Sequence, residues 1–300
     1  MTTPALSVII VNYNTADLLP GCLDSIGRQG VSCEIIVVDN ASRDQSVDLL
    51  HERYPGVTVI ANRTNEGFSR ANNQGLRRCR GELVFFLNPD TIVQPGCLAA
   101  MLDFMPARPE VAMAGTALFD PDFSPHPSVE YTYPGHRYAR QELSGLPGDI
   151  AWILGAALVS RRDRMERVGG FDERFFLYGE DVDLGLVMRK RGWRLGSIPG
   201  AGVVHLEGQS ERNSAPMEVF KKKLRAELLF YDKHYSENTV RRICRAYEWQ
   251  ARWRLFSLRL TLPWCRDRET AGLKRDRYRV ALEFYNGRKS GCPETGRLTR

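Results

Sequence analysis

Short, unbroken apolar runs alternate with amphipathic segments along the first third of the chain. The runs are rich in β-branched and aromatic residues and have the length of strands that are covered on both faces. Between them, apolar residues recur at helical spacing, as they do over 18–26. Strands and helices that alternate in this way are typical of a parallel α/β sheet. The predicted strands are 6–13, 34–38, 57–61, 82–87 and 111–115.

Polar residues follow the ends of the first four predicted strands. Asn14 follows the first strand, Asp39 closes the second, and the loop at Asn65 follows the third. In parallel sheets of this kind, ligands bind beyond the carboxyl ends of the strands. The fourth strand runs directly into a turn between Asn88 and Asp90, where a carboxylate suits a divalent cation. A turn without a ligand is the alternative interpretation.

A stretch of aromatic and acidic residues at 171–186 contains several candidate functional residues close together. Glu180, Asp181 and Asp183 precede apolar positions that fit one face of a helix, so they lie near a predicted helix start. There the positive end of the helix dipole favours negative charge, and backbone N–H groups can orient carboxylates. By itself the stretch leaves two interpretations open, an acidic helix cap and a functional site.

Composition places the chain among ordinary globular proteins. It has 300 residues, 43% hydrophobic and 26% charged, enough for one large domain and an appendage. No run approaches the roughly 20 apolar residues of a membrane-spanning helix, and the N-terminal pattern does not predict a secretory signal. Seven scattered cysteines without a CxxC pair predict reduced thiols in a cytoplasmic protein, with neither a disulfide framework nor a zinc site.

Charge is distributed unevenly along the chain. From Ser210 onward, 22 Lys and Arg accompany 11 Asp and Glu, a net charge of +11, whereas the preceding residues carry 20 and 25, a net charge of −5. Two segments of this basic tail, 217–235 and 240–262, place aromatic and aliphatic residues at helical spacing among lysines and arginines. Such helices suit the surface of an anionic membrane. Packing onto the rest of the chain, or onto a second copy, is the alternative.

Nucleic acid is a poor match for the basic tail. A nucleic-acid-binding protein usually combines its positive charge with a recognisable reading element. The sequence carries no helix-turn-helix, RNA-binding or zinc signature beside the basic segments. We therefore expect no nucleic-acid partner.

Seven sequence motifs follow one another along the chain. They are SVIIVNYN, IIVVDNASRD, NEGFSRANNQG, FFLNPD, ILGAALVSRR, GGFDERFFLYGEDVDLGLVMRKRGW and VVHLEG. Their order resembles family 2 glycosyltransferases with the GT-A fold, and more narrowly the bacterial rhamnosyltransferase-like branch that builds cell-surface polysaccharide. The resemblance covers roughly residues 5–210 and does not cover the tail.

The resemblance implies an α/β architecture with a helical extension. A Rossmann-like mixed, mainly parallel sheet flanked by helices is expected over 1–210, the GT-A catalytic domain. Within it, 1–115 is the expected nucleotide-binding part and 116–210 the acceptor-side part. Residues 211–300 are the expected basic amphipathic helical tail.

The resemblance also implies which residues bind the nucleotide-sugar donor. Asp39 matches the acid that contacts the nucleobase, and Asn65, Gly67 and Asn72 match the loop that lines the nucleotide. A single acid at Asp39 suits the imide of either pyrimidine, so the residues do not decide among thymidine, uridine and guanosine diphosphate sugars. The matched wall of the nucleoside pocket consists of Val11, Asn12, Tyr13 and Asn14.

A divalent cation, Mg²⁺ or Mn²⁺, follows from the same resemblance. Asp90 stands at the second acid of the family's Asp-x-Asp motif, and Asn88 replaces the first acid, which leaves the site one charge poorer. His205 matches a late histidine that completes the metal site in related enzymes. A cation held there would neutralise charge on the departing diphosphate.

The acidic stretch acquires a catalytic role from the resemblance. Asp181 matches the general base that takes the proton of the acceptor hydroxyl, and Glu180 and Asp183 would orient it or the acceptor. In the family a single displacement inverts the anomeric centre. We therefore expect no nucleophilic Ser or Cys.

The segment around 152–156 matches the part of the family's site against which the donor sugar and the acceptor lie. Trp152 offers an aromatic face to a sugar ring, and Gly155 and Ala156 permit its close approach. For the last two residues, a buried strand packed by small side chains is an equal alternative. The long polar segment 117–149 is predicted to be a loop that helps to choose the acceptor.

The predicted function is an inverting, metal-dependent hexosyl transfer to a cell-surface glycan or a lipid-linked acceptor, with dTDP-L-rhamnose favoured by the resemblance. A transferase that uses a UDP- or GDP-sugar and a catalytically inert nucleotide-sugar-binding scaffold are the alternatives. The scaffold is disfavoured because Asp90, Asp181 and His205 are all present. We further expect a cytoplasmic protein attached peripherally to the inner face of the cell membrane, with a homodimer through the tail as the alternative use of the basic helices.

Overall fold

The computed structural model describes residues 4–206, 215–261 and 268–287. The chain divides into two compact units, and each is described by itself. The sheet unit comprises the described residues of Met1–Tyr133 and Gly145–Asn213. The C-terminal unit comprises those of Pro134–Ser144 and Ser214–Arg300.

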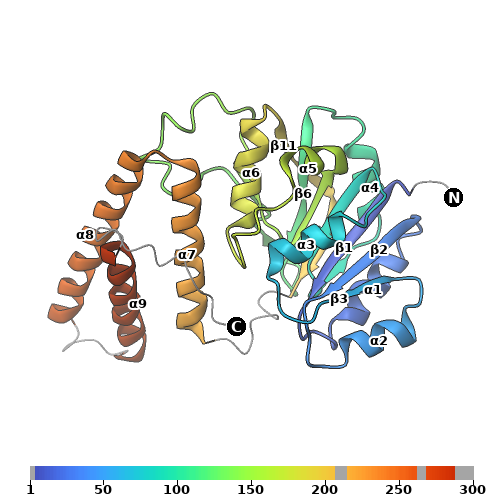
Figure 1. The fold of residues 1–300 in the computed structure, drawn as a ribbon, viewed down its shortest axis with the longest axis horizontal. Coiled ribbons are helices and arrows are strands. Elements are labelled where there is room, and N and C mark those ends of the chain that lie inside the picture. The colour runs from blue at the N-terminus through green and yellow to red at the C-terminus, as the bar shows by residue number, and fades with distance from the viewer. Residues whose placement is uncertain (1–3, 207–214, 262–267, 288–300) are drawn as a thin grey trace. The chain divides into compact units, whose positions relative to one another are not determined.

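A nine-stranded sheet runs through the sheet unit (Figure 1). Its order is β3-β2-β1-β4-β10-β6-β11-β5, with β7 paired to β6. β1, β2, β3 and β4 are parallel, β6 and β11 are parallel, and β10 and β5 are antiparallel to their neighbours, so the sheet is mixed and mainly parallel, as predicted. These strands are β1 (Leu6–Asn12), β2 (Cys33–Asp39), β3 (Thr58–Ala61), β4 (Leu83–Leu87), β5 (Thr91–Val93), β6 (Val111–Phe119), β7 (Pro125–His126), β10 (Ala157–Arg161) and β11 (Arg194–His205). A separate two-stranded sheet pairs β8 (Val129–Glu130) with β9 (Trp152–Ile153).

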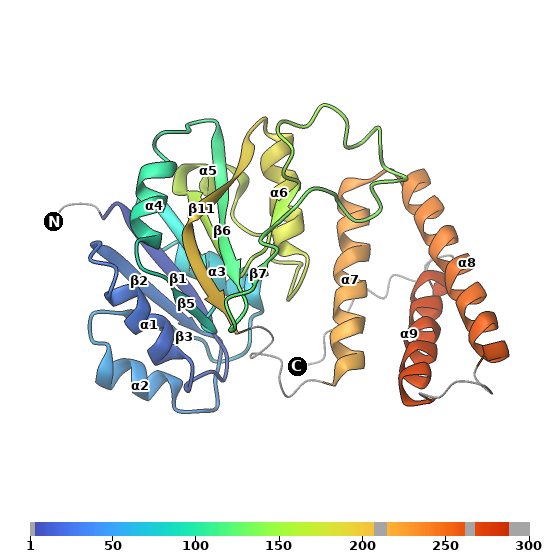
Figure 2. The same cartoon turned by 180° about the vertical axis from the view of Figure 1, so that it is seen from behind.

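Helices cover both faces of the large sheet (Figures 1 and 2). Every residue of β1 is buried because its side chains alternate between two cores. Val8 and Ile10 face the core with α1, α2 and α4, whereas Ile9 and Val11 face the core with α3, α5 and α6. The helices are α1 (Leu19–Gly27), α2 (Ser46–Arg53), α3 (Phe68–Leu76), α4 (Cys97–Phe104), α5 (Arg162–Val168) and α6 (Glu180–Lys190).

The segment 117–149 departs from the prediction of one polar loop. β6 continues to Phe119, and the short strands β7 and β8 follow it. Tyr133 is buried, and its hydroxyl donates a hydrogen bond to the carbonyl of Ala151 at 2.5 Å. The guanidinium of Arg189 on α6 is also buried and donates to the carbonyl of Gly148 at 2.6 Å. Long-range hydrogen bonds therefore hold a segment that lacks an apolar pattern of its own.

Three helices and a short crossing segment make up the C-terminal unit. They are α7 (Pro216–His234), α8 (Glu237–Thr261) and α9 (Arg268–Gly287), and each packs against the other two. The segment Pro134–Ser144 belongs here because Tyr235 donates its hydroxyl hydrogen to the Pro134 carbonyl at 2.6 Å. The predicted helix 240–262 corresponds to α8, and its last residue lies outside the described residues. No helix in the described part of the chain is long and apolar enough to cross a membrane.

The described cysteines are free thiols. They are Cys22, Cys33, Cys79, Cys97 and Cys244, while Cys265 and Cys292 lie outside the described residues. Burial raises the pKa of Cys22 and Cys97 to about 12, so both remain protonated at neutral pH. These two side chains therefore act as small apolar groups in the core.

Candidate active site

Most predicted site residues gather along one edge of the large sheet. Asn12 and Asp39 end β1 and β2 and lie directly opposite each other. β10 begins beside the end of β4, because Ala157 pairs with Leu87. β11 is parallel to β6 and ends at His205 on the same edge. This is the carboxyl edge of the parallel strands, where ligands bind in open α/β sheets.

Asp39 is held between two hydrogen-bond donors at the end of β2. Its Oδ2 accepts from the Asn12 amide at 2.8 Å, and its Oδ1 accepts from the Ser42 backbone N–H at 2.9 Å. Asn12 is oriented in turn by the hydroxyl of Thr15 at 2.5 Å. Asp39 is 1% exposed, so its orientation is rigid before any ligand arrives. The other residues of the predicted nucleoside wall are Val11, which is buried, and Tyr13 and Asn14, which are half-buried.

Asn40 links the end of β2 to the predicted nucleotide loop. Its amide donates to Asn65 Oδ1 at 2.9 Å and to the Gly67 carbonyl at 3.2 Å, and its Oδ1 accepts from the Glu66 N–H at 2.9 Å. Gly67 has φ 84°, and a Cβ there would lie 2.7 Å from the Phe176 carbonyl, so only glycine fits. Asn40 was not singled out from the sequence. Its position directly after Asp39 at a strand end was the available signal.

Helix α3 is clamped to the segment that precedes α6. Asn73 donates its amide to the Phe171 carbonyl at 2.8 Å, and its Oδ1 accepts from the Phe171 N–H at 2.9 Å. The Phe68 N–H donates to the Phe176 carbonyl at 2.7 Å. Asn72, the residue predicted to line the nucleotide, is buried, and its side chain donates within its own helix, to the Phe68 carbonyl at 3.1 Å. The neighbouring Asn73, which the sequence did not reveal, makes the long-range contact.

Asp181 is linked to the Asn88 turn through two consecutive residues, Gly155 and Ala156, that directly precede β10. Its Oδ2 accepts from the Gly155 N–H at 3.0 Å, and its Oδ1 accepts from the Val182 N–H at 2.8 Å. The carbonyl of the following residue, Ala156, accepts from the Asn88 N–H at 2.9 Å. The predicted general base and the predicted metal-binding turn are therefore joined by one short piece of backbone.

The first turn of α6 carries three buried carboxyl groups. Glu180, Asp181 and Asp183 are all buried. Burial, with a smaller contribution from the charges of Asp181 and Asp183, raises the pKa of Glu180 to about 8. Burial also raises the pKa of Asp181, but the N–H groups of Gly155 and Val182 oppose that shift. Glu180 is therefore expected to hold a proton at neutral pH, while the N–H groups of Gly155 and Val182 stabilise the charged form of the neighbouring Asp181.

Asp90, beyond the end of β4, and His205, the last residue of β11, form a buried pair. The Nε2 of His205 lies 3.4 Å from Asp90 Oδ1, and the Leu206 N–H donates to the Asp90 carbonyl at 2.9 Å. The Nδ1 of His205 is buried without a hydrogen-bond partner in the described chain. No group of three or more His, Cys, Asp and Glu residues arranged to hold a metal ion occurs among the described residues. A carboxylate and an imidazole fit a cation that takes its other ligands from a diphosphate and water.

Trp152 lies against α6. Its indole N–H donates to the Thr132 carbonyl at 3.1 Å, and its side chain is half-buried. α6 crosses β9 at Gly185, where a Cβ would lie 2.8 Å from both the Ala151 carbonyl and the Trp152 Cβ. The close approach of helix and strand therefore requires glycine. It places the predicted sugar-stacking residue beside the helix that carries Asp181.

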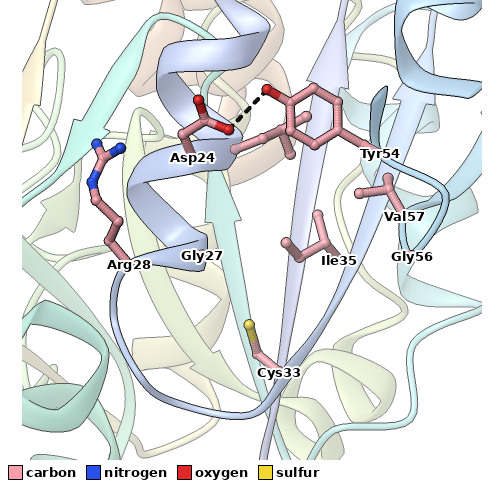
Figure 3. Close-up of a pocket in the computed structure, with 9 residues that line it drawn as sticks. Asp24, Gly27, Arg28, Cys33, Ile35, Tyr54, Gly56 and Val57 are labelled. Atoms are coloured by element: carbon pink, nitrogen blue, oxygen red, sulfur yellow. Dashed lines mark hydrogen bonds between the residues drawn. The ribbon is translucent and has the colours of Figure 1, made fainter. Parts of the chain in front are cut away.

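A pocket of about 470 Å³ lies elsewhere in the sheet unit. Figure 3 shows Tyr54 donating its hydroxyl hydrogen to Asp24 at 2.9 Å on the wall of this pocket. The lining includes Cys33, the first residue of β2, and Val57, which precedes β3. The pocket therefore lies at the amino ends of these strands. It is separate from the carboxyl edge where the predicted site residues gather.

Comparison with known proteins decides the family. The model described as Glycosyl transferase family 2 matches residues 7–158, and the model described as Glycosyl transferase family group 2 matches residues 83–261. The chain belongs to glycosyltransferase family 2. This glycosyltransferase is 30% identical to the N-acetylglucosaminyl-diphospho-decaprenol L-rhamnosyltransferase of Mycobacterium tuberculosis, over 69% of this chain and 78% of the relative. It is 24% identical to the rhamnosyltransferase WbbL of Escherichia coli K12, over 69% of this chain and 85% of the relative.

Solved structures share the fold of this glycosyltransferase. The mannosyltransferase PcManGT from Pyrobaculum calidifontis, in complex with GDP-Man and Mn²⁺, aligns with a TM-score of 0.60 and 18% identity over 96% of this chain and 89% of that chain. Staphylococcus aureus TarS 1-349, in complex with UDP-GlcNAc, aligns with a TM-score of 0.59 and 16% identity over 94% of this chain and 91% of that chain. The predicted GT-A fold and the predicted rhamnosyltransferase-like branch are confirmed.

The buried acid of Glu180 predicts a pH-dependent stability. Its pKa is raised from 4.5 to about 8, so the stability it contributes is fully present below pH 4.5 and is lost as the pH rises through about 8. Glu180→Gln should remove this loss and flatten the pH dependence of the free energy of unfolding over that window. Urea unfolding at several pH values measures it. Glu166→Gln, at an exposed position of α5, is the control, and curves for Glu180→Gln and wild type that run parallel would contradict the prediction.

Proposed function

We propose that this glycosyltransferase moves L-rhamnose from dTDP-L-rhamnose, with inversion, to a cell-surface glycan or a lipid-linked acceptor. The anchoring of Asp181 carries the proposal. Its carboxylate is oriented by the Gly155 N–H, one residue before the carbonyl that receives the Asn88 N–H. A general base and a cation-binding turn are what a transfer from a nucleotide diphosphate sugar requires.

The donor is proposed from the relatives. The two relatives named above are rhamnosyltransferases. The two solved structures hold GDP-Man and UDP-GlcNAc, so a GDP- or UDP-sugar is the alternative donor. A catalytically inert scaffold is a weaker alternative. Burying the carboxyl groups of Glu180 and Asp181 lowers the stability of the fold, and buried acids of this kind are typical of active sites.

The proposed reaction is one displacement at the anomeric carbon. Residues 1–115 hold the nucleotide with Asp39 at the base, and residues 116–210 hold the acceptor. The acceptor hydroxyl gives its proton to the Asp181 carboxylate while its oxygen bonds to the anomeric carbon, opposite the diphosphate. The bond between that carbon and the diphosphate oxygen breaks, and the nucleoside diphosphate leaves with the electron pair. Glu180, protonated at neutral pH, adds no second charge beside the base.

Asp90 and His205 are the proposed protein ligands of Mg²⁺ or Mn²⁺, with Asn88 as a neutral oxygen ligand. The 3.4 Å separation of His205 Nε2 and Asp90 Oδ1 supports the assignment, because both groups face the same point. When bound, the cation supplies positive charge to the departing diphosphate. Asp183 and Glu180 orient the base or the acceptor, and Trp152, Gly155 and Ala156 form the sugar floor.

A peripheral position on the cytoplasmic face of the cell membrane suits a lipid-linked acceptor. The net charge of +11 from Ser210 onward supports attraction to anionic lipid. A homodimer through the C-terminal unit is the alternative use of these helices. The segment 117–149 is proposed to help choose the acceptor.

Calorimetry with a panel of nucleotide sugars tests the proposed donor. We expect dTDP-L-rhamnose to bind much more tightly than UDP-GlcNAc or GDP-mannose, and its binding to weaken when EDTA removes the divalent cation. Preference for a UDP- or GDP-sugar would select the alternative donor. If no nucleotide sugar binds with or without Mn²⁺, the proposed function is wrong.

A further inference from the structure

One face of α8 exposes a continuous row of large apolar side chains. Trp249, Trp253, Phe256 and Leu260, here called the aromatic stripe, are 68%, 55%, 53% and 57% exposed. Their spacing of four, three and four residues places them on one side of the helix. The ring centroids of Trp249 and Trp253 lie 6.2 Å apart, with an angle of 4° between the ring planes. The ring centroids of Trp253 and Phe256 lie 6.0 Å apart. The stripe is therefore one surface, and contiguous exposed apolar surfaces usually mark an interaction site.

The stripe is not the face with which α8 joins its own unit. Val240, Ile243 and Ala251 lie on the other side of the helix and are buried. α7 behaves differently, because its apolar residues Leu224 and Tyr231 are buried. Of the two segments predicted to suit a membrane surface, α8 is thus the one that carries an outward apolar face in addition to an inward one.

Arginines follow the stripe along one edge. Arg245, Arg252 and Arg259 are exposed and recur every seven residues, which places them in a row on the same side of the helix. Arg252 also pairs with Glu248 at 3.0 Å. After Glu248, residues 249–261 contain no Asp or Glu. The second half of α8 is therefore apolar on one face and positive at its rim.

We propose that α8 lies along the surface of an anionic lipid bilayer, with the aromatic stripe inserted among the headgroups and the arginine row against the lipid phosphates. Indole rings favour this region because one end is apolar and the N–H end is polar. The guanidinium groups match the phosphates in charge and geometry. In a homodimer through this face, each copy would present its own arginine row to the other. Residues 249–261 contain no Asp or Glu that could pair with it. This inference deepens the proposed function and rests on it for the lipid-linked acceptor.

Flotation with vesicles tests the stripe in the full-length protein. We expect the wild-type protein to float with vesicles of equimolar phosphatidylcholine and phosphatidylglycerol. With vesicles of phosphatidylcholine alone, it should remain at the bottom of the gradient. Trp249→Ser/Trp253→Ser should bind at least about tenfold more weakly, because two exposed indoles lose their burial in lipid. Brominated lipid should quench tryptophan fluorescence in wild type and much less in this variant.

A matched pair of leucines supplies the control. Leu260 on the stripe and Leu273 on α9 are 57% and 54% exposed. Leu260→Ser should weaken vesicle binding, whereas Leu273→Ser should not. Circular dichroism checks that each variant is folded, as expected from the exposure of all the replaced side chains.

The outcomes separate this proposal from the proposed function. The membrane role would be overturned if Leu260→Ser and Leu273→Ser lost vesicle binding equally, or if the wild-type protein did not float with anionic vesicles. So would a wild-type dimer that Trp249→Ser/Trp253→Ser converts to a monomer without any vesicle binding. Nucleotide-sugar calorimetry on the same proteins is independent of lipid, so retained donor binding in these cases would leave the glycosyltransferase reaction standing.

Discussion

Asp181→Asn is expected to lower turnover by about 10³-fold, because a positioned general base contributes roughly 10²–10⁴-fold. Asparagine has the same shape as aspartate, and its carbonyl oxygen can still accept from the Gly155 N–H that now orients Asp181 at 3.0 Å. It cannot take the acceptor's proton. Donor binding should therefore change little, and initial rates together with calorimetry measure the two effects separately.

An exposed acid provides the control for this substitution. Asp163 on α5 is 53% exposed at its side chain, and Asp163→Asn should leave both turnover and donor binding unchanged. Turnover of Asp181→Asn within tenfold of wild type would contradict the assignment of the base. Loss of donor binding in the same variant would instead place Asp181 in the donor site.

Asp90→Asn is expected to weaken the affinity for Mn²⁺ by about 100-fold, the upper end of the range of roughly 10–100-fold found when groups that support a metal site are altered. The substitution removes the negative charge that lies 3.4 Å from His205 Nε2. His205→Gln should have a smaller effect in the same direction, because a neutral ligand is replaced by another neutral group. Titration of activity with Mn²⁺, at saturating donor, measures the change in cation affinity.

A second carboxylate–histidine pair in the sheet unit makes a matched control. Asp120 Oδ1 lies 3.1 Å from His126 Nδ1, but both side chains are partly exposed. Asp120→Asn should leave the Mn²⁺ titration unchanged. If Asp90→Asn and Asp120→Asn behave alike, the buried pair is not the cation site. Asp181→Asn should also leave the Mn²⁺ affinity unchanged, which separates the two functional groups.

The first half of the sheet could be predicted from the sequence because its signal is local. The predicted strand 6–13 is β1 (Leu6–Asn12), and 82–87 is β4 (Leu83–Leu87). Each is a continuous apolar run, which a strand covered on both faces requires. β11 gives no such run, since glycines and a proline interrupt Arg194–His205. It forms through pairing with β6, with a shift of register between Ile198 and Gly202.

The site was predictable only in part for a related reason. Asp39 and Asp90 follow apolar strands, and Asp181 opens a helix, so their positions are visible in the sequence. The partners that orient them are not. Asn73 bonds to a residue 98 positions away, and Gly155 to one 26 positions away. No periodicity connects residues so far apart.

The sequence by itself determined the alternation of strands and helices, the polar residues at the strand ends, and the basic, aromatic character of α8. Those properties depend on backbone periodicity over a few neighbouring residues. Only the tertiary structure decided that Glu180 is desolvated, that Asp90 meets His205, and that the aromatic stripe faces outward. Burial and hydrogen bonding depend on segments distant in the chain, which come together only when the sheet and the helices pack.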